Sequence, residues 1–147
     1  MWYLELIMSI GLIVLLVQGI NFVDLASDER IVNAETVNLM EVLMDIQERS
    51  RDYHYMESGD FRPICYIYSD KYEVVLQFHG KKITHHLPED IKINFYDSGG
   101  YYVFRQESLY NGWPNKTIKV YKNNVAKYII INRVGRIRVS KYYKEPS

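Results

Sequence analysis

One carboxylate near the start of the chain stands where it needs a partner. Glu5 precedes an uncharged run, from Leu6 to Val23, that is rich in Ile, Leu and Val. A carboxylate in such an apolar span is costly unless a positive charge or water meets it. Because no basic side chain occurs before Arg30, the residues favour pairing of Glu5 with a free N-terminal amine, that of Met1 on a neighbouring chain. The alternative is that Glu5 lies near a helix end and reaches a membrane interface.

A second chemically informative set is basic and lies near the end of the chain. From Ser108 to Lys144 there are nine Lys and Arg residues and no acid. Arg136 and Arg138 are two residues apart and would share one face of a strand, where two guanidinium groups suit phosphate. The alternative is that these arginines protect a sheet edge or serve packing. The candidate DNA- or anion-binding residues are Arg133, Arg136, Arg138, Lys141 and Lys127.

The two halves of the chain carry opposite charge. Residues 1–59 contain ten acids and three bases, whereas residues 60–147 contain eight acids and 15 bases, so a formally neutral chain is strongly polarised. The basic half indicates an anionic partner: DNA, teichoic acid, phospholipid headgroups or the acidic stripe of another subunit. Nothing in the sequence resembles base readout, so binding to DNA would be non-specific in sequence.

The other reactive residues do not form a catalytic or metal-binding set. His85 and His86 would face opposite sides of a strand, so they cannot easily share a metal ion with His54 or His79. Cys65 is the single cysteine, and its apolar neighbours predict a buried thiol. The chain contains no GxSxG, HExxH, Walker or GxGxxG motif. We therefore expect a protein that is not an enzyme and that holds no metal or cofactor.

These residues need a long helix to position them. Residues 1–23 predict a transmembrane segment of roughly 35 Å, and residues 24–52 predict its amphipathic continuation, so that the whole helix has about 50 residues. An acidic stripe on the continuation is interpreted as a solvated face. It comprises Glu41, Asp45, Glu48 and Asp52. The opposite stripe recurs at helical spacing and should be buried. It comprises Val32, Thr36, Leu39, Leu43 and Ile46.

Residues 53–147 predict a globular antiparallel β domain, because apolar residues there recur with a period of two between turn-forming residues. The fold class expected is therefore α+β, with the helix packed on the β domain. Eight strands are predicted: Pro63–Tyr68, Tyr72–His79, Lys82–His86, Ile91–Tyr96, Tyr101–Arg105, Thr117–Lys122, Val125–Asn132 and Arg136–Ser140.

The start of the chain resembles the mature start of type IV pilins and pseudopilins. The resemblance rests on Met-Trp-Tyr-Leu-Glu at positions 1–5, the apolar run that follows, and the amphipathic continuation. It implies that a prepilin peptidase removes a basic leader before Met1, that the amine of Met1 is methylated, and that Glu5 serves filament assembly. Met1 and Trp2 depart from the Phe-Thr that is commoner in the family.

The β domain resembles one branch of that family, the GspH/FimT group, together with the ComGD-type competence minor pilins of Gram-positive bacteria. The resemblance rests on Leu87–Ile93, on Tyr128–Ile131 and on the Gly-Arg segment Gly135–Val139. In some FimT-like proteins the Gly-Arg-x-Arg element is associated with DNA capture. Residues 53–86 carry no resemblance.

The resemblance implies a minor pilin of a competence-type, type IV-like pilus that contributes to filament assembly and DNA uptake. Its partners would be other pilin subunits in a hetero-oligomeric filament, the membrane, the prepilin peptidase and DNA. It would cross the cell membrane once, with its C-terminal domain outside, and enter the surface pilus. Two alternatives stay open: a pseudopilin of a type II secretion system, and a membrane-tethered binding module that does not assemble.

Overall fold

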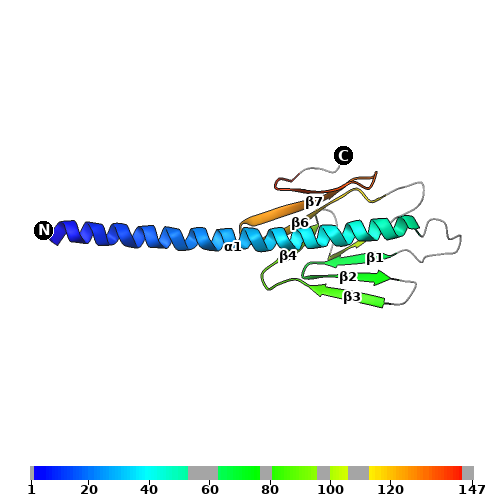
Figure 1. The fold of residues 1–147 in the computed structure, drawn as a ribbon, viewed down its shortest axis with the longest axis horizontal. Coiled ribbons are helices and arrows are strands. Elements are labelled where there is room, and N and C mark those ends of the chain that lie inside the picture. The colour runs from blue at the N-terminus through cyan, green and yellow to red at the C-terminus, as the bar shows by residue number, and fades with distance from the viewer. Residues whose placement is uncertain (1, 53–62, 77–80, 96–99, 106–112, 144–147) are drawn as a thin grey trace.

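The structure is a computed structural model that describes residues 2–52, 63–76, 81–95, 100–105 and 113–143. Within these ranges the chain forms one helix and eight strands, an α+β arrangement. The helix, α1 (Trp2–Asp52), extends along the whole molecule (Figure 1). Its first half projects beyond the strands, and its second half lies against them. The predicted α+β class and the predicted single long helix are confirmed.

The second half of α1 is held by the stripe that the spacing predicted. Val32, Leu39, Leu43 and Ile46 are completely buried, and so is Thr36. The Thr36 hydroxyl donates a hydrogen bond of 2.6 Å to the carbonyl of Val32, which satisfies this buried polar group within the helix. No proline interrupts α1, so the helix continues through residues 24–30.

The opposite face of α1 is solvated, as predicted. Glu41, Asp45 and Glu48 are exposed, and Asp45 accepts a hydrogen bond of 2.8 Å from Nε of Arg49 one turn further on. The side chain of Asp52 lies outside the described part of the structure. Glu41 and Glu48 of the acidic stripe therefore lie at the surface of the domain, and Asp45 pairs with Arg49 there.

The strands form two antiparallel sheets of four. The first has the order β3-β2-β1-β5 and the second the order β4-β6-β7-β8. All eight predicted strands are present with shifts at their ends. Residues 77–79 of the second predicted strand and Tyr96 of the fourth lie outside the described ranges. The strands are β1 (Ile64–Tyr68), β2 (Lys71–Leu76), β3 (Lys81–His86), β4 (Lys92–Phe95), β5 (Tyr101–Phe104), β6 (Lys116–Lys122), β7 (Val125–Ile131) and β8 (Ile137–Ser140).

The core lies where α1 meets both sheets. In Figure 1, β6 and β7 lie along one side of the helix and β1 to β3 along the other. A hydrogen bond of 2.8 Å from the amide of Ile93 to the carbonyl of Ser69 joins the two sheets. The completely buried strand residues include Ile67, Phe104, Ile118, Val120, Ile129 and Ile131. The helix stripe and the inner faces of both sheets thus form one apolar core.

One carboxylate is almost completely buried in the first sheet. Glu73 on β2 accepts hydrogen bonds of 2.8 Å from the ammonium groups of Lys71 and Lys82, one on each carboxylate oxygen. These bonds, that from Lys71 first, lower the pKa of Glu73 below its ordinary value of 4.5. The ionised form is therefore the one that the folded state stabilises.

Glu73 should contribute to the acid sensitivity of the fold. Because its pKa is lowered on folding, its contribution is fully present above pH 4.5 and is lost as the pH falls through the folded-state pKa. Replacing Glu73 with Gln should lower the unfolding midpoint above pH 4.5, and the difference from the wild type should shrink at lower pH. Thermal unfolding followed by circular dichroism measures this.

The matched control is Glu89→Gln, which changes an exposed carboxylate in the turn before β4. It should leave the unfolding midpoint unchanged at every pH. A Glu73→Gln midpoint that stays below the wild type by the same amount at low pH would contradict the assignment.

Candidate functional site

Of the two predicted assembly residues, Met1 and Glu5, only Glu5 can be placed, and it lies in the projecting half of α1. Met1 lies outside the described residues, and Glu5 lies within α1 but its side chain is outside the described part. The structure therefore places Glu5 on the helix backbone and gives no geometry for its carboxylate. Among the described residues, no helix combines the length and the apolarity that a membrane crossing requires.

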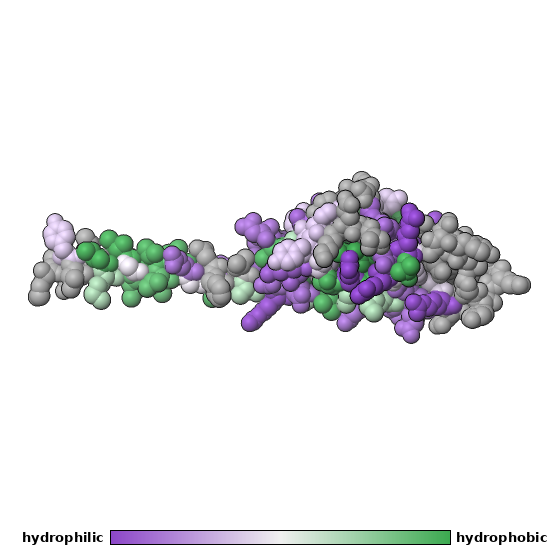
Figure 2. Space-filling model, turned by 90° about the horizontal axis from the view of Figure 1, so that it is seen from above, coloured by the Kyte–Doolittle hydropathy of each residue, from purple (hydrophilic) through white to green (hydrophobic). Residues whose placement is uncertain are grey.

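The projecting part of α1 is nonetheless apolar where its side chains are described. Nine large apolar side chains between Ile7 and Val17 are each 49–69% exposed. Figure 2 shows this segment as a hydrophobic rod next to a largely hydrophilic domain. Continuous apolar exposure of this extent is typical of surfaces that another apolar phase or protein covers.

The basic candidates Arg136 and Arg138 lie together on the C-terminal hairpin. Both line one recess of about 80 Å³ with Ile130 and Asn132. Arg138 is exposed on β8, the edge strand of the second sheet. Its neighbours Ile137 and Val139 pack against the core, which confirms the predicted alternation. Two guanidinium groups at one recess can both reach a single phosphate-bearing chain.

Arg136 is not the first residue of the strand, which corrects the prediction. β8 begins at Ile137. The amide of Arg136 instead donates a 2.8 Å hydrogen bond to Oδ1 of Asn132, and its carbonyl accepts one of 3.2 Å from the amide of Asn132. Arg136 therefore closes the loop at residues 132–136, and the Asn132 side chain accepts the hydrogen bond that a neighbouring strand would otherwise accept.

Gly135 fixes this loop against the helix. Its φ of +82° belongs to the left-handed region, and its carbonyl accepts a 2.8 Å hydrogen bond from the buried Gln47 side chain of α1. A Cβ at this position would lie 2.7 Å from Cδ1 of Trp113. Trp113 stacks on Phe104 with ring centroids 4.9 Å apart, so it cannot easily move away. Glycine is thus required at position 135 for two reasons: its positive φ and the close approach of Trp113.

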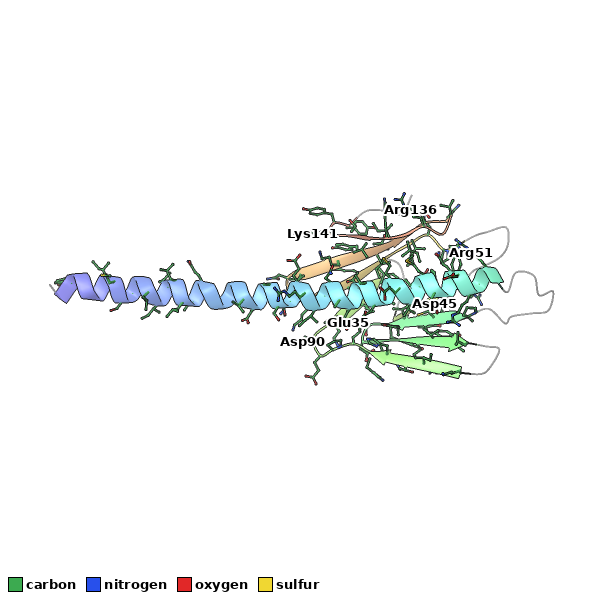
Figure 3. All side chains as sticks on the ribbon, viewed as in Figure 1. Glu35, Asp45, Arg51, Asp90, Arg136 and Lys141 are labelled. Carbon is green, nitrogen blue, oxygen red and sulfur yellow. The ribbon has the colours of Figure 1, made fainter. Side chains whose placement is uncertain are left out.

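Arg133 and Lys141 are exposed, whereas Lys127 is engaged within the chain. Nζ of Lys127 lies 3.6 Å from a carboxylate oxygen of Glu29 on α1, and the Lys127 side chain is mostly buried. Figure 3 places Arg136 and Lys141 along the C-terminal hairpin, on the side of α1 away from β3. The exposed candidates therefore follow one edge of the second sheet, and Lys127 lies inside it.

A second base from the same region also has an internal partner. Nζ of Lys122 lies 3.1 Å from Asp28 on α1, and Nδ2 of Asn123 donates a 2.8 Å hydrogen bond to the same carboxylate. The hydrogen bonds from Asn123 and then Lys122 lower the pKa of Asp28. Part of the charge asymmetry between the two halves of the chain thus serves to dock α1 on the β6–β7 hairpin.

His85 and Cys65, which the sequence excluded from a catalytic or metal-binding set, have structural roles. Nε2 of His85 lies 3.1 Å from Glu35 on α1, and its ring stacks on Tyr72. Burial raises the pKa of the Cys65 thiol to about 12. In the described ranges no group of three or more His, Cys, Asp or Glu residues could hold a metal ion. His54 and His79 lie outside those ranges.

Comparison with known proteins adds no relative: no family model matches the chain, and neither a curated protein nor a solved structure matches it.

Sequence reasoning missed the residues that position the arginines. Gln47 and Trp113 hold the 132–136 loop, yet Gln47 is 88 residues away from Gly135. A glutamine beside the apolar stripe of a helix, such as Gln47, does not indicate a loop contact until its hydrogen-bond partner is known. The glycine itself was the available signal, since a glycine between two strands indicates a turn with positive φ.

The close approach at Gly135 predicts an unusually large effect of one methyl group. Gly100 also has a positive φ, +80°, but no heavy atom lies within 4 Å of its Cβ position. Gly100→Ala should therefore cost only the left-handed penalty, about 1–2 kcal/mol. Gly135→Ala should cost roughly 1–3 kcal/mol more, because Trp113 or the loop must shift.

Chemical denaturation of both variants measures the difference in free energy of unfolding. Tryptophan fluorescence of the Gly135→Ala protein should also change, because Trp113 is displaced. Equal destabilisation by the two substitutions would show that the loop moves freely away from Trp113.

Proposed function

We propose that this protein is a filament subunit of the type IV pilin-like class, a minor pilin of a competence-type pilus that contributes to assembly and DNA uptake. The observation that supports this most is the division of α1. One uninterrupted helix of 51 residues buries an apolar stripe under two antiparallel sheets in its second half and exposes apolar side chains in its first.

The two halves of α1 expose their apolar side chains to different surroundings, so each half needs a different apolar partner to exclude water. The stripe from Val32 to Ile46 is covered by the protein's own sheets. The residues between Ile7 and Val17 have no such cover. Lipid tails before assembly and neighbouring helices after it supply the missing cover in the proposed role.

In the proposed filament, Glu5 fixes how the helices of adjacent subunits align along their axes. In the apolar environment of packed helices its carboxylate pairs with the N-terminal amine of an adjacent subunit, because no basic side chain precedes Arg30. A non-assembling membrane tether has no use for this carboxylate. Glu5 therefore favours a filament subunit over a simple anchored binding module.

A second candidate activity is phosphate binding to DNA by the C-terminal hairpin. It is supported by the shared recess of Arg136 and Arg138 and by the loop that Gly135 fixes next to it. Lys127 is withdrawn from this surface by Glu29, so the proposed contact comprises Arg133, Arg136, Arg138 and Lys141. Binding through phosphates gives affinity without sequence preference.

The alternative filament role is that of a pseudopilin in type II secretion. Its helix and Glu5 would serve in the same way, but its cargo is protein and the basic edge would be incidental. The genes that neighbour this one distinguish the two: DNA-uptake genes favour the competence pilus, and secretin-type genes favour the pseudopilus.

Glu5→Ala tests the assembly role. The variant should fold and enter the membrane normally, because losing a carboxylate makes insertion easier. Its amount in sheared filaments should fall about tenfold or more, because the neighbouring amine loses its partner in an apolar site. Immunoblots of membranes and of sheared filaments measure both quantities.

The matched control is Asp24→Ala, which removes an exposed carboxylate from the same helix just beyond the apolar run. It should leave filament entry unchanged. Wild-type amounts of Glu5→Ala protein in sheared filaments would contradict the pairing.

The DNA contact predicts a change in salt dependence. Arg136→Ala with Arg138→Ala should weaken DNA binding and flatten the slope of log affinity against log salt by about one unit per lost phosphate contact. Lysine at both positions should restore binding only in part, because lysine keeps the charge and loses the planar fork. Fluorescence anisotropy with labelled DNA at three salt concentrations gives the slopes.

Lys81→Ala with Lys92→Ala removes the same charge from exposed positions on β3 and β4 and serves as the control. It should change the slope much less. If both double variants bind DNA as the wild type does, the arginines have a structural or protein-binding role.

A further inference from the structure

The loop at the distal end of the second sheet presents an unusual set of exposed side chains. Val134 is 85% exposed, and it lies between the exposed residues Arg133 and Arg136. We call Arg133, Val134 and Arg136 the basic tip. A partner that binds this loop would bury one apolar side chain between two charged contacts, and arginine is enriched at protein interfaces.

The basic tip is held firmly in place. The amide of Gly135 donates a 2.9 Å hydrogen bond to the carbonyl of Asn132, and the amide of Trp113 donates one of 3.2 Å to the carbonyl of Arg133. Gln47 binds the carbonyl of Gly135 from α1. A loop that is ordered before it binds loses little conformational entropy on association.

The exposed face of α1 offers the complementary set. Glu41, Met44 and Glu48 fall within about 60° of helix arc, and we call them the acidic patch. Met44 is 49% exposed. Asp45 lies beside the patch but already pairs with Arg49. Among the described residues, neither Glu41 nor Glu48 has a hydrogen-bonding or ionic partner.

The two surfaces match in charge and in the apolar residue that each exposes, yet they do not meet within one chain. No ion pair joins Arg133 or Arg136 to Glu41 or Glu48 in the described part of the structure, although the tip is bound to α1 through Gln47. The Gly135 turn and Trp113 fix the loop where it is. Both charged surfaces are therefore available to a second molecule.

We propose that the basic tip of one copy docks on the acidic patch of α1 in a second copy. Arg133 and Arg136 pair with Glu41 and Glu48, and Val134 packs on Met44. Because each chain carries both surfaces, copies in the same orientation can add one after another, which is a heterologous contact. This inference rests on the proposed function and deepens it, since it adds a contact between two copies to the contacts with other pilin subunits that a hetero-oligomeric filament contains.

A charge swap tests the contact with the full-length chain. Two copies with different affinity tags are expressed together, extracted in mild detergent and purified through one tag, and the yield of the other tag is measured. The tip-reversed variant is Arg133→Glu with Arg136→Glu, and the patch-reversed variant is Glu41→Lys with Glu48→Lys. All four side chains are exposed, so circular dichroism spectra and unfolding midpoints should match the wild type.

Each reversed variant should fail to bind itself, with a fall in recovered partner of about tenfold or more, because like charges then face each other. The tip-reversed variant should bind the patch-reversed variant. A chain that carries all four substitutions should bind itself again. Reversal of exposed lysines elsewhere, Lys81→Glu with Lys92→Glu, should change nothing.

A cysteine pair gives an independent measurement. Cys65 is completely buried and has a raised pKa, so it is silent towards mild oxidation. A copy with Glu48→Cys should form a disulfide with a copy carrying Arg133→Cys, and much less with a copy carrying Lys92→Cys.

Three results would overturn the contact: no co-purification of wild-type copies, reversed variants that bind themselves as the wild type does, or loss without recovery in the four-substitution chain. Failure of the filament role is read separately, from sheared filaments. If wild-type protein enters filaments and the charge reversals do not change co-purification, only the proposed contact is contradicted. If the charge swap restores co-purification but the wild-type protein does not enter filaments, only the filament role is contradicted.

Discussion

The rest of the structure depends on burial of one helix stripe beneath two sheets. Val32, Leu39, Leu43 and Ile46 lose all contact with water, and they do so because strands from both sheets converge on the second half of α1. Full burial of each such side chain contributes about 1.5–3 kcal/mol. The helix stripe and the inner faces of both sheets share one core, so the sheets cover this half of the helix and the helix covers apolar side chains of the sheets. The division of α1 into a covered half and a projecting half follows from where the strands end.

Polar contacts then fix how the helix is oriented on the sheets. Asp28 meets Lys122 and Asn123 at the β6–β7 turn, Glu29 meets Lys127, and Gln47 binds Gly135 at the other end of the domain. Apolar packing alone would tolerate sliding of the helix along its axis, whereas hydrogen bonds at both ends define one position. The same contacts decide which bases are left for partners. Lys122 and Lys127 are engaged by acids of α1, and Arg133, Arg136, Arg138 and Lys141 are not buried.

The fold was predictable from the sequence because its signals are periodic and local. The stripe on α1 follows the helical period, the eight strands follow a period of two, and the turns carry Gly, Asn or Asp, including Asn123 and Asp90 with positive φ. The pairing of Lys127 with Glu29 and of Gln47 with Gly135 was not predictable, because each joins residues about 90 or more positions apart and depends on the register of the packed helix. The number of Lys and Arg residues in the C-terminal region was evident from the sequence. That number could not distinguish the bases that pair with acids of α1 from the bases that stay exposed. The start of β8 was wrong by one residue because the Asn132 side chain takes the hydrogen bond that a strand partner would make.

The requirement for glycine at position 135 connects the core to the surface. Trp113 stacks on Phe104 inside the core and also limits the space at Gly135, so core packing sets the path of the loop that carries Arg133, Val134 and Arg136. The glycine of the Gly-Arg pattern therefore has a structural reason that is independent of any ligand, since it allows the close approach to Trp113. The same arginines serve both proposed contacts, with the phosphates of DNA and with the carboxylates of a second copy. Glu41 and Glu48 offer two carboxylates on a rigid helix with an exposed Met44 beside them, whereas a DNA backbone offers charge without an apolar surface to cover Val134. Val134 therefore distinguishes the two proposed contacts: a second copy would cover it, whereas phosphate binding depends on the recess that Arg136 and Arg138 share.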